Sequence, residues 1–161
     1  MIFCGIDPGI QGAIAFIYDD GTIDLEDMPI SSLQKKTGTG KRWETDGHKL
    51  ADLFRRNERM AVFVERVHSM PGDGRPAAFS FGRSYGTILG VLGALKIRPE
   101  LISPQVWKKQ FGLIKKTKEG SRLKALEIYP QCGTGLQRKK DHGRAEALLI
   151  AEYGRKNLWE L

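Results

Sequence analysis

Short apolar or alternating stretches in the first 28 residues predict β-strands. Residues 2–6 (IFCGI) form an apolar run that ends at an Asp-Pro-Gly turn at 7–9, and residues 12–18 (GAIAFIY) form a second run. After an Asp-Asp-Gly turn at 19–21, residues 22–28 (TIDLEDM) alternate with period two. We expect these three strands to form an antiparallel meander.

The segment 29–45 is rich in Gly, Ser, Thr and Lys, and its composition predicts a basic loop. Residues 38–41 (GTGK) suggest a phosphate-binding loop, but Lys35 stands where that motif needs its first glycine, and Arg42 replaces the Ser or Thr that follows the lysine. We therefore interpret the segment as a flexible basic loop rather than a nucleotide site.

Helical patterns alternate with apolar strands in the rest of the chain. Residues 61–65 (AVFVE) are apolar and rich in β-formers, which is typical of a central parallel strand, and 100–103 (ELIS) predict another. Helices are expected over about 46–57, 77–95, 103–107 and 121–129, and from about 141 onward. The order β-β-β-α-β-α-β-α-α-α predicts one mixed α/β domain over residues 1–161.

Composition narrows the class of protein. Apolar residues make up 40% of the chain, which is enough for a core, and no 18-residue apolar run or signal peptide is visible. Cys4 and Cys132 match no metal-binding spacing, so we expect a reduced, intracellular protein. No transit peptide is visible, so we expect the cytoplasm of a bacterial or phage-infected cell rather than a plastid. The net charge of +7 favours a polyanionic partner, nucleic acid before membrane.

Two carboxylates end predicted strands. Asp7 follows the first apolar run and Glu65 ends the run at 61–65. If these strands are parallel neighbours, both carboxylates lie at the same edge of the sheet, where ligand sites form. Each also has a simpler interpretation, as a turn residue for Asp7 and as an ion-pair partner of Arg66 for Glu65.

Three ionisable residues open the last predicted helix. His142 and Glu146 are four positions apart and share one helical face. Asp141 falls off that face and is expected to be the N-cap or, alternatively, a ligand of a metal ion. Taken singly, His142 and Glu146 are also explained as surface residues. Together with Asp7 and Glu65 they predict a site for Mg²⁺ or Mn²⁺, and two such ions about 4 Å apart can hydrolyse a phosphodiester.

Several motifs resemble those of the RuvC-type Holliday junction resolvases, and most closely their monokaryotic chloroplast branch with its bacterial and phage relatives. GIDPGIQGAIAF and VFVE resemble the first two acidic motifs of that family. FGRSYGTILGVL, SPQVWK, KEGSR and KKDHGRAEALLIAEYG follow in the same order, and together the motifs span residues 1–154. The last of them is long and specific.

The resemblance implies an RNase H-like fold, with a five-stranded mixed sheet flanked by helices, and a homodimer that cuts four-way DNA junctions by paired nicks. It implies two Mg²⁺ ions per active site, with Mn²⁺ able to substitute, held by Asp7, Glu65 and Glu146. Lys118 matches a lysine near the scissile phosphate. Bacterial relatives usually carry an acidic residue or histidine where this chain has Gly143. The helical spacing and the chloroplast-like motif favour His142 as the fourth ligand, with Asp141 as a second choice.

Other surfaces are candidates for DNA or dimer contacts. Four glycines of the helix at 77–95 (82, 86, 90 and 93) line one side, and they predict close packing either on the sheet or on a second copy. Residues 68–75 predict a mobile loop over DNA. The remaining candidate DNA contacts are basic or aromatic: Lys35, Lys36, Lys41, Arg42, Arg75, Phe79, Phe81, Arg83, Lys108, Lys109, Lys115, Lys116, Lys139, Lys140 and Arg144.

Other functions stay open. A related nuclease could cut RNA–DNA hybrids or branched and flap DNA, and a DNA-binding module could have kept the fold without catalysis. An actin-like ATPase is disfavoured because the chain is short for a second phosphate-binding half. No small-molecule substrate or membrane partner is expected.

Overall fold

A computed structural model describes residues 1–34, 41–57, 59–68, 72 and 74–158. Five strands form one mixed sheet in the order β3-β2-β1-β6-β7. Strands β1, β2 and β3 form the expected antiparallel meander, while β1, β6 and β7 run parallel. The five-stranded mixed sheet is therefore confirmed, with these bounds: β1 (Ile2–Asp7), β2 (Ala13–Ile17), β3 (Ile23–Asp27), β6 (Met60–Glu65) and β7 (Glu100–Ile102).

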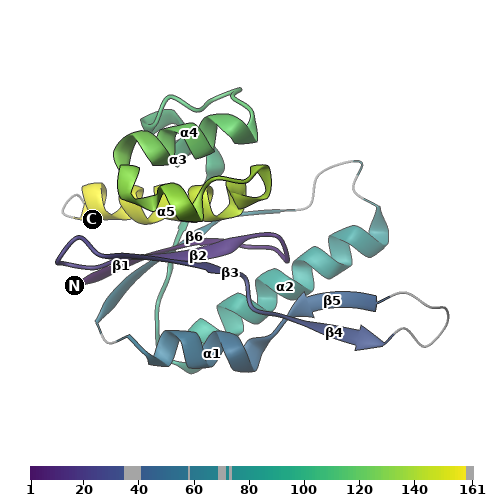
Figure 1. Ribbon diagram of the computed structural model, residues 1–161. Helices are drawn as coiled ribbons and strands as arrows, with labels where there is room; N and C mark the ends of the chain where they lie inside the picture. The colour runs from purple at the N-terminus through teal and green to yellow at the C-terminus, as the bar shows by residue number, and fades with distance from the viewer. Residues whose placement is uncertain (35–40, 58, 69–71, 73, 159–161) are drawn as a thin grey trace.

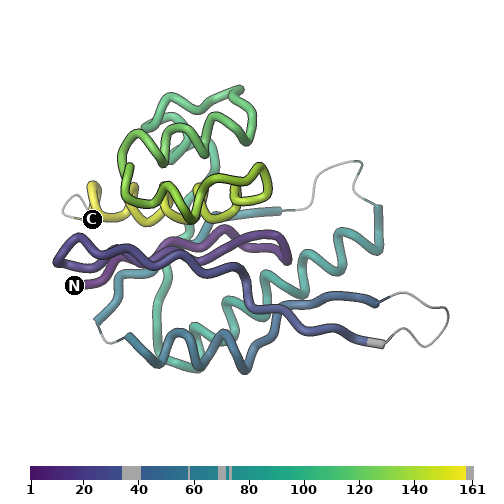
Figure 2. Tube along the Cα trace, in the orientation of Figure 1, coloured from purple at the N-terminus to yellow at the C-terminus, as the bar shows by residue number. Residues whose placement is uncertain are grey.

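The predicted loop over residues 29–45 is wrong where the structure describes it. Strands β4 (Ile30–Gln34) and β5 (Lys41–Thr45) form a separate antiparallel hairpin, while residues 35–40 lie outside the described residues. Figure 2 shows the hairpin extending beyond the main sheet. Exposure alternates along β5 through Lys, Arg, Trp, Glu and Thr, so its period of two is carried mostly by polar residues. An apolar pattern therefore does not reveal it.

Five α-helices are described, and they cover both faces of the sheet. Helices α3, α4 and α5 lie on one face, while α1, α2 and the β4–β5 hairpin lie on the other (Figure 1). No described helix is long and apolar enough to cross a membrane. The bounds are α1 (Gly47–Arg55), α2 (Arg75–Ala94), α3 (Pro104–Gln110), α4 (Lys118–Ile128) and α5 (His142–Asn157), with short 3₁₀ helices η1 (Pro130–Gly135) and η2 (Lys139–Asp141).

Strand alternation divides the apolar residues between two cores. Cys4 and Ile6 of β1 join the core beneath α1 and α2, whereas Phe3 packs on the opposite core, which α5 covers. Gly5 also faces α5, since a Cβ there would lie 2.1 Å from the Ala147 carbonyl oxygen. This backbone contact lets α5 lie directly on β1, which brings the first turn of the helix to the end of that strand.

Candidate active site

The two strand-end carboxylates lie side by side. Strands β1 and β6 are parallel neighbours in which Ile6 pairs with Val64, so Asp7 and Glu65 leave the sheet at the same edge. Both residues share the strand parity of Gly5, and both therefore face α5. The predicted convergence of these two carboxylates is confirmed.

Helix α5 supplies the third carboxylate. Glu146 is buried one residue before Ala147, at the position where α5 touches β1. It opens on a cleft of about 310 Å³ between the β1–β2 turn and the starts of α4 and α5. The residues that line this cleft are Asp7, Pro8, Gly9, Ile10, Gln11, Gly12, Phe81, Lys118, His142 and Glu146.

Asp7 and Glu146 line this cleft, whereas Glu65 does not but still acts on Asp7 through its charge. The pKa of Asp7 is raised well above its ordinary value, chiefly because burial disfavours the charged form and further because Glu146 and Glu65 repel it. The positive charges of Lys118 and Lys108 act in the opposite direction. Burial also raises the pKa of Glu65. Two buried carboxyl groups with raised pKa values, next to a third carboxylate, are typical of a cation site.

Donors from α3 and α4 hold the two glutamates. The Trp107 indole N–H donates to Glu65 Oε1 at 3.0 Å, and the Ser121 hydroxyl donates to Glu146 Oε1 at 3.1 Å. Lys108 Nζ lies 3.5 Å from the same Glu146 oxygen. Trp107 and Ser121 each lie in a motif matched above, but neither residue was predicted to belong to the site. Their partners are 42 and 25 positions away, so no local pattern reveals these contacts.

The ring of His142 is turned towards the cleft. Its Nδ1 lies 3.2 Å from the Lys139 carbonyl oxygen, which can only accept, so Nδ1 carries the proton in this hydrogen bond. Nε2 then presents a lone pair and accepts from Lys118 Nζ at 3.1 Å. This tautomer suits a metal ligand as well as a hydrogen-bond acceptor.

Asp141 occupies a different environment. Its carboxylate accepts from the Arg138 backbone N–H at 2.8 Å and from the Arg138 guanidinium. Asp141 precedes α5, but its side chain accepts no hydrogen bond from the backbone of that helix, so the expected capping contact is wrong. It caps the start of η2 instead, and it lines a neighbouring cavity rather than the cleft.

The position of Gly143 leaves no room for a side chain. A Cβ there would lie 2.6 Å from the Gln11 carbonyl oxygen and 3.3 Å from Asp7 Oδ2. The β1–β2 turn thus fills the space that an acidic residue or histidine would need. His142, one position earlier in the first turn of α5, does line the cleft.

The basic candidates are spread around this edge of the molecule. Arg83 pairs with Glu44 of the hairpin, and Arg144 pairs with Asp27 at 2.6 Å, so both guanidinium groups already have partners. Lys35 and Lys36 lie outside the described residues, and so does part of the segment 68–75. Arg42 and Lys108 are half-buried; the exposed candidates are Lys41, Arg75, Lys109, Lys115, Lys116, Lys139 and Lys140.

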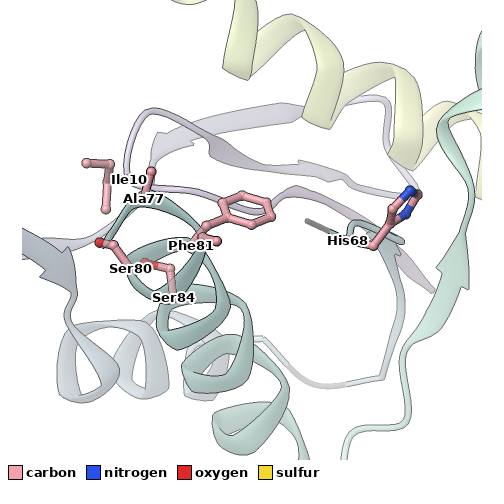
Figure 3. A pocket seen from close by; sticks show the side chains of 7 residues that line it. Ile10, His68, Ala77, Ser80, Phe81 and Ser84 are labelled. Carbon is pink, nitrogen blue, oxygen red and sulfur yellow. The ribbon is translucent and has the colours of Figure 1, made fainter. Parts of the chain in front are cut away.

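A second groove of about 500 Å³ adjoins the cleft and shares Ile10 and Phe81 with it. Figure 3 shows Ile10, Phe81 and His68 around this groove, with Phe81 projecting from the first half of α2. Phe79 is 64% exposed, and it remains a candidate for contact with DNA bases.

Within the described part of the chain, no three His, Cys, Asp or Glu side chains are placed closely enough to hold one metal ion. One oxygen of Glu65 accepts a hydrogen bond from Trp107, and one oxygen of Glu146 contacts Ser121 and Lys108. The donor set nevertheless fits a hard divalent cation, because carboxylate oxygens predominate and the repulsion acting on Asp7 would be relieved by positive charge.

Comparisons with known proteins agree on one group. No protein-family model matches the chain. Over 92 residues, it is 37% identical to the chloroplastic Holliday junction resolvase MOC1 of Chlamydomonas reinhardtii, a match that covers 56% of this chain and 10% of that protein. The chain thus spans about a tenth of the length of this relative.

Two solved structures of RuvC from Thermus thermophilus share the fold. One, at 17% identity, has a TM-score of 0.59 and covers 98% of this chain and 97% of that one. The other, described as RuvC in complex with Holliday junction substrate, is 16% identical, has a TM-score of 0.61 and covers 99% of this chain and 96% of that one. The similarity drawn from the sequence motifs is thus confirmed, and the chain shares the fold of RuvC, a five-stranded mixed sheet flanked by helices.

Proposed function

We propose that this protein is a structure-specific endonuclease that resolves four-way DNA junctions by paired, metal-dependent phosphodiester hydrolysis. The observation that carries the proposal is the convergence of Asp7, Glu65 and Glu146 on one face, at one edge of a RuvC-type sheet. The sequence similarity to a chloroplastic junction resolvase supports the same substrate class.

Asp7, Glu65 and Glu146 would hold divalent ions, with His142 as the fourth ligand. Asp141 is less suitable as a ligand because its carboxylate already accepts hydrogen bonds from the backbone and guanidinium of Arg138. When bound, Mg²⁺ or Mn²⁺ would activate water and stabilise the charge that develops on the phosphate, and we propose two ions in each site. Lys108 and Lys118 lie beside this acidic group in the structure and supply part of the charge that offsets it.

The lysines and the ring of His142 organise the phosphate side of the cleft. Lys118 lies at the cleft mouth, where its ammonium group can donate to a phosphate oxygen instead of to His142 Nε2. The exposed lysines Lys115, Lys116, Lys139 and Lys140 lie close to it in sequence or in space and would bind flanking phosphates. Binding that depends on such contacts weakens steeply with salt.

The glycine face of α2 supports a homodimer. Gly82, Gly86, Gly90 and Gly93 are exposed, and a Cβ at each would meet nothing within 4 Å, so packing of these glycines on the sheet is wrong. Helix α2 buries Ser84, Ile88 and Leu92 instead. A four-way junction has two equivalent strands to cut, which matches a dimer with twofold symmetry. We therefore propose that the glycine faces of two copies pack against each other in the homodimer.

Gly86→Leu is expected to weaken the dimer, because a bulky side chain prevents close approach of two backbones. Overpacking of this kind costs about 1–3 kcal/mol, or about 10- to 100-fold in the dissociation constant. Sedimentation equilibrium measures this constant directly. Glu127→Leu, which adds the same side chain at an exposed site of α4, is the control. Equal dissociation constants for the Gly86 variant and the wild type would place the dimer elsewhere.

Substrate competition tests the proposed function against its alternatives. A labelled immobile junction, a linear duplex of the same arms and an RNA–DNA hybrid are incubated with the protein in Mg²⁺, in Mn²⁺ and in EDTA. The proposal expects metal-dependent cutting of the junction alone. Preferred cutting of the hybrid would favour the RNA–DNA nuclease, and tight junction binding without cutting in either metal would favour a binding module.

The site of action, the cytoplasm of a bacterial or phage-infected cell, stays a prediction.

A further inference from the structure

Trp107 is fully buried, yet its one polar group points at the candidate active site. Strand β7 pairs with the end of β6, where Glu65 lies opposite Ile102, and α3 begins two residues later. The first turn of α3 therefore carries Trp107 to the buried face of Glu65. The indole N–H donates to Glu65 Oε1 at 3.0 Å, and the ring packs in the core that α5 covers.

This hydrogen bond fixes one oxygen of a buried carboxylate. Glu65 is only 8% exposed, and a buried carboxylate with unfixed rotamers would lose entropy when it binds an ion. The indole N–H is a neutral donor without acceptor capacity, so it can hold one oxygen of Glu65 without competing as a ligand or adding positive charge. Oε2 is then left for another partner.

The same arrangement recurs at the third carboxylate. Ser121 is buried and donates its hydroxyl to Glu146 Oε1, so each glutamate has one oxygen held by an uncharged donor from a neighbouring helix. Lys108, the next residue of α3, lies 3.5 Å from Glu146. Helix α3 thus contacts both glutamates through consecutive residues, which makes its placement important for the whole site.

We propose that Trp107 is a positioning residue, which fixes the Glu65 carboxylate so that its second oxygen faces the space shared with Asp7 and Glu146, where it serves as a ligand for a divalent ion. This inference rests on the proposed metal-dependent function. Outer hydrogen bonds of this kind change metal affinity by about 10- to 100-fold. The contribution of Trp107 is thus expected in metal binding rather than in the stability of the fold.

Replacing Trp107 with 3-benzothienylalanine, which has sulfur in place of the indole N–H, tests the hydrogen bond alone. Mn²⁺ binding to the protein without DNA is measured by titration calorimetry, and the melting temperature is measured in EDTA. The proposal expects the Mn²⁺ affinity to fall about 10-fold, with a melting temperature close to that of the wild type. In junction cleavage, half-maximal activity should need more Mn²⁺, and excess Mn²⁺ should restore the rate.

Trp43→Phe is the matched control, because Trp43 lies on the exposed hairpin strand β5 and its loss should leave Mn²⁺ affinity unchanged. Trp107→Phe is a second test variant that also removes the N–H. An unchanged Mn²⁺ affinity in the benzothienylalanine variant, whatever its melting temperature, would overturn the role of Trp107 while leaving the nuclease intact. A wild-type protein that binds no Mn²⁺ would overturn both this inference and the proposed metal-dependent function.

Discussion

Replacing Asp7 with asparagine is expected to lower the rate of junction cleavage by about 10³-fold or more. The charges of both Glu65 and Glu146 act on Asp7, which is buried at the end of β1. The amide of asparagine keeps the shape but loses the negative charge that would bind a cation. Metal binding should fall with activity, which calorimetry with Mn²⁺ measures.

The same substitution is expected to stabilise the metal-free fold. Because burial and two like charges raise the pKa of Asp7, the folded state holds its proton more tightly than the unfolded state. Stability therefore falls as the pH rises above the ordinary value of the aspartate pKa, and this loss is largest once the group is ionised. At neutral pH in EDTA, Asp7→Asn should melt higher by roughly 2–4 °C, corresponding to about 1 kcal/mol.

Asp52→Asn provides the control for both effects, because Asp52 is exposed on α1 and pairs only locally with Arg55. It should change neither cleavage nor melting temperature appreciably. An Asp7→Asn protein that cuts junctions at the wild-type rate would show that the three carboxylates are not the active site.

Gly5→Ala is expected to have the largest effect on folding. A Cβ at this position would lie 2.1 Å from the Ala147 carbonyl oxygen and 2.3 Å from the Ala151 amide nitrogen. Both atoms belong to the backbone of α5, so neither can move aside as a flexible side chain would. Separating α5 from β1 would open the core between them, at a cost of about 4 kcal/mol or more.

Chemical denaturation measures this loss, and Gly133→Ala is the matched control because a Cβ there meets nothing within 4 Å. The control should change the free energy of unfolding by less than about 1 kcal/mol. If Gly5→Ala proved equally mild, α5 would not lie on β1 as closely as described, and the placement of Glu146 beside Asp7 would need revision.

The main sheet was predictable because its strands are either apolar or alternate with period two. The run at 61–65 has the continuous apolar character of a strand covered on both faces, and its parallel pairing with β1 meets the condition under which Asp7 and Glu65 converge. The hairpin β4–β5 was missed because its pattern is carried by residues such as Lys41, Arg42 and Glu44, and because its strands pair only with each other.

The residues of the candidate site that are placed by strand order were predictable. Those placed by side-chain contacts between distant segments were not. Asp7 and Glu65 follow from two parallel neighbours, and Glu146 from the helix that covers them. The sequence favoured His142 but kept Asp141 as a second choice, because the ion pair of Asp141 with Arg138 depends on the 3₁₀ turn before α5. Trp107 could not be assigned because its partner is 42 residues away.

Linearisation of a supercoiled plasmid that extrudes a cruciform tests the central claim most directly. The cruciform is a four-way junction, and two paired nicks across it release a linear plasmid, whereas a single nick gives an open circle. The account predicts linear product in Mg²⁺, with hairpin ends whose nicks DNA ligase can seal, and no product with EDTA or with Asp7→Asn. Open circles without linear product, or equal cutting of a plasmid without the cruciform, would contradict it.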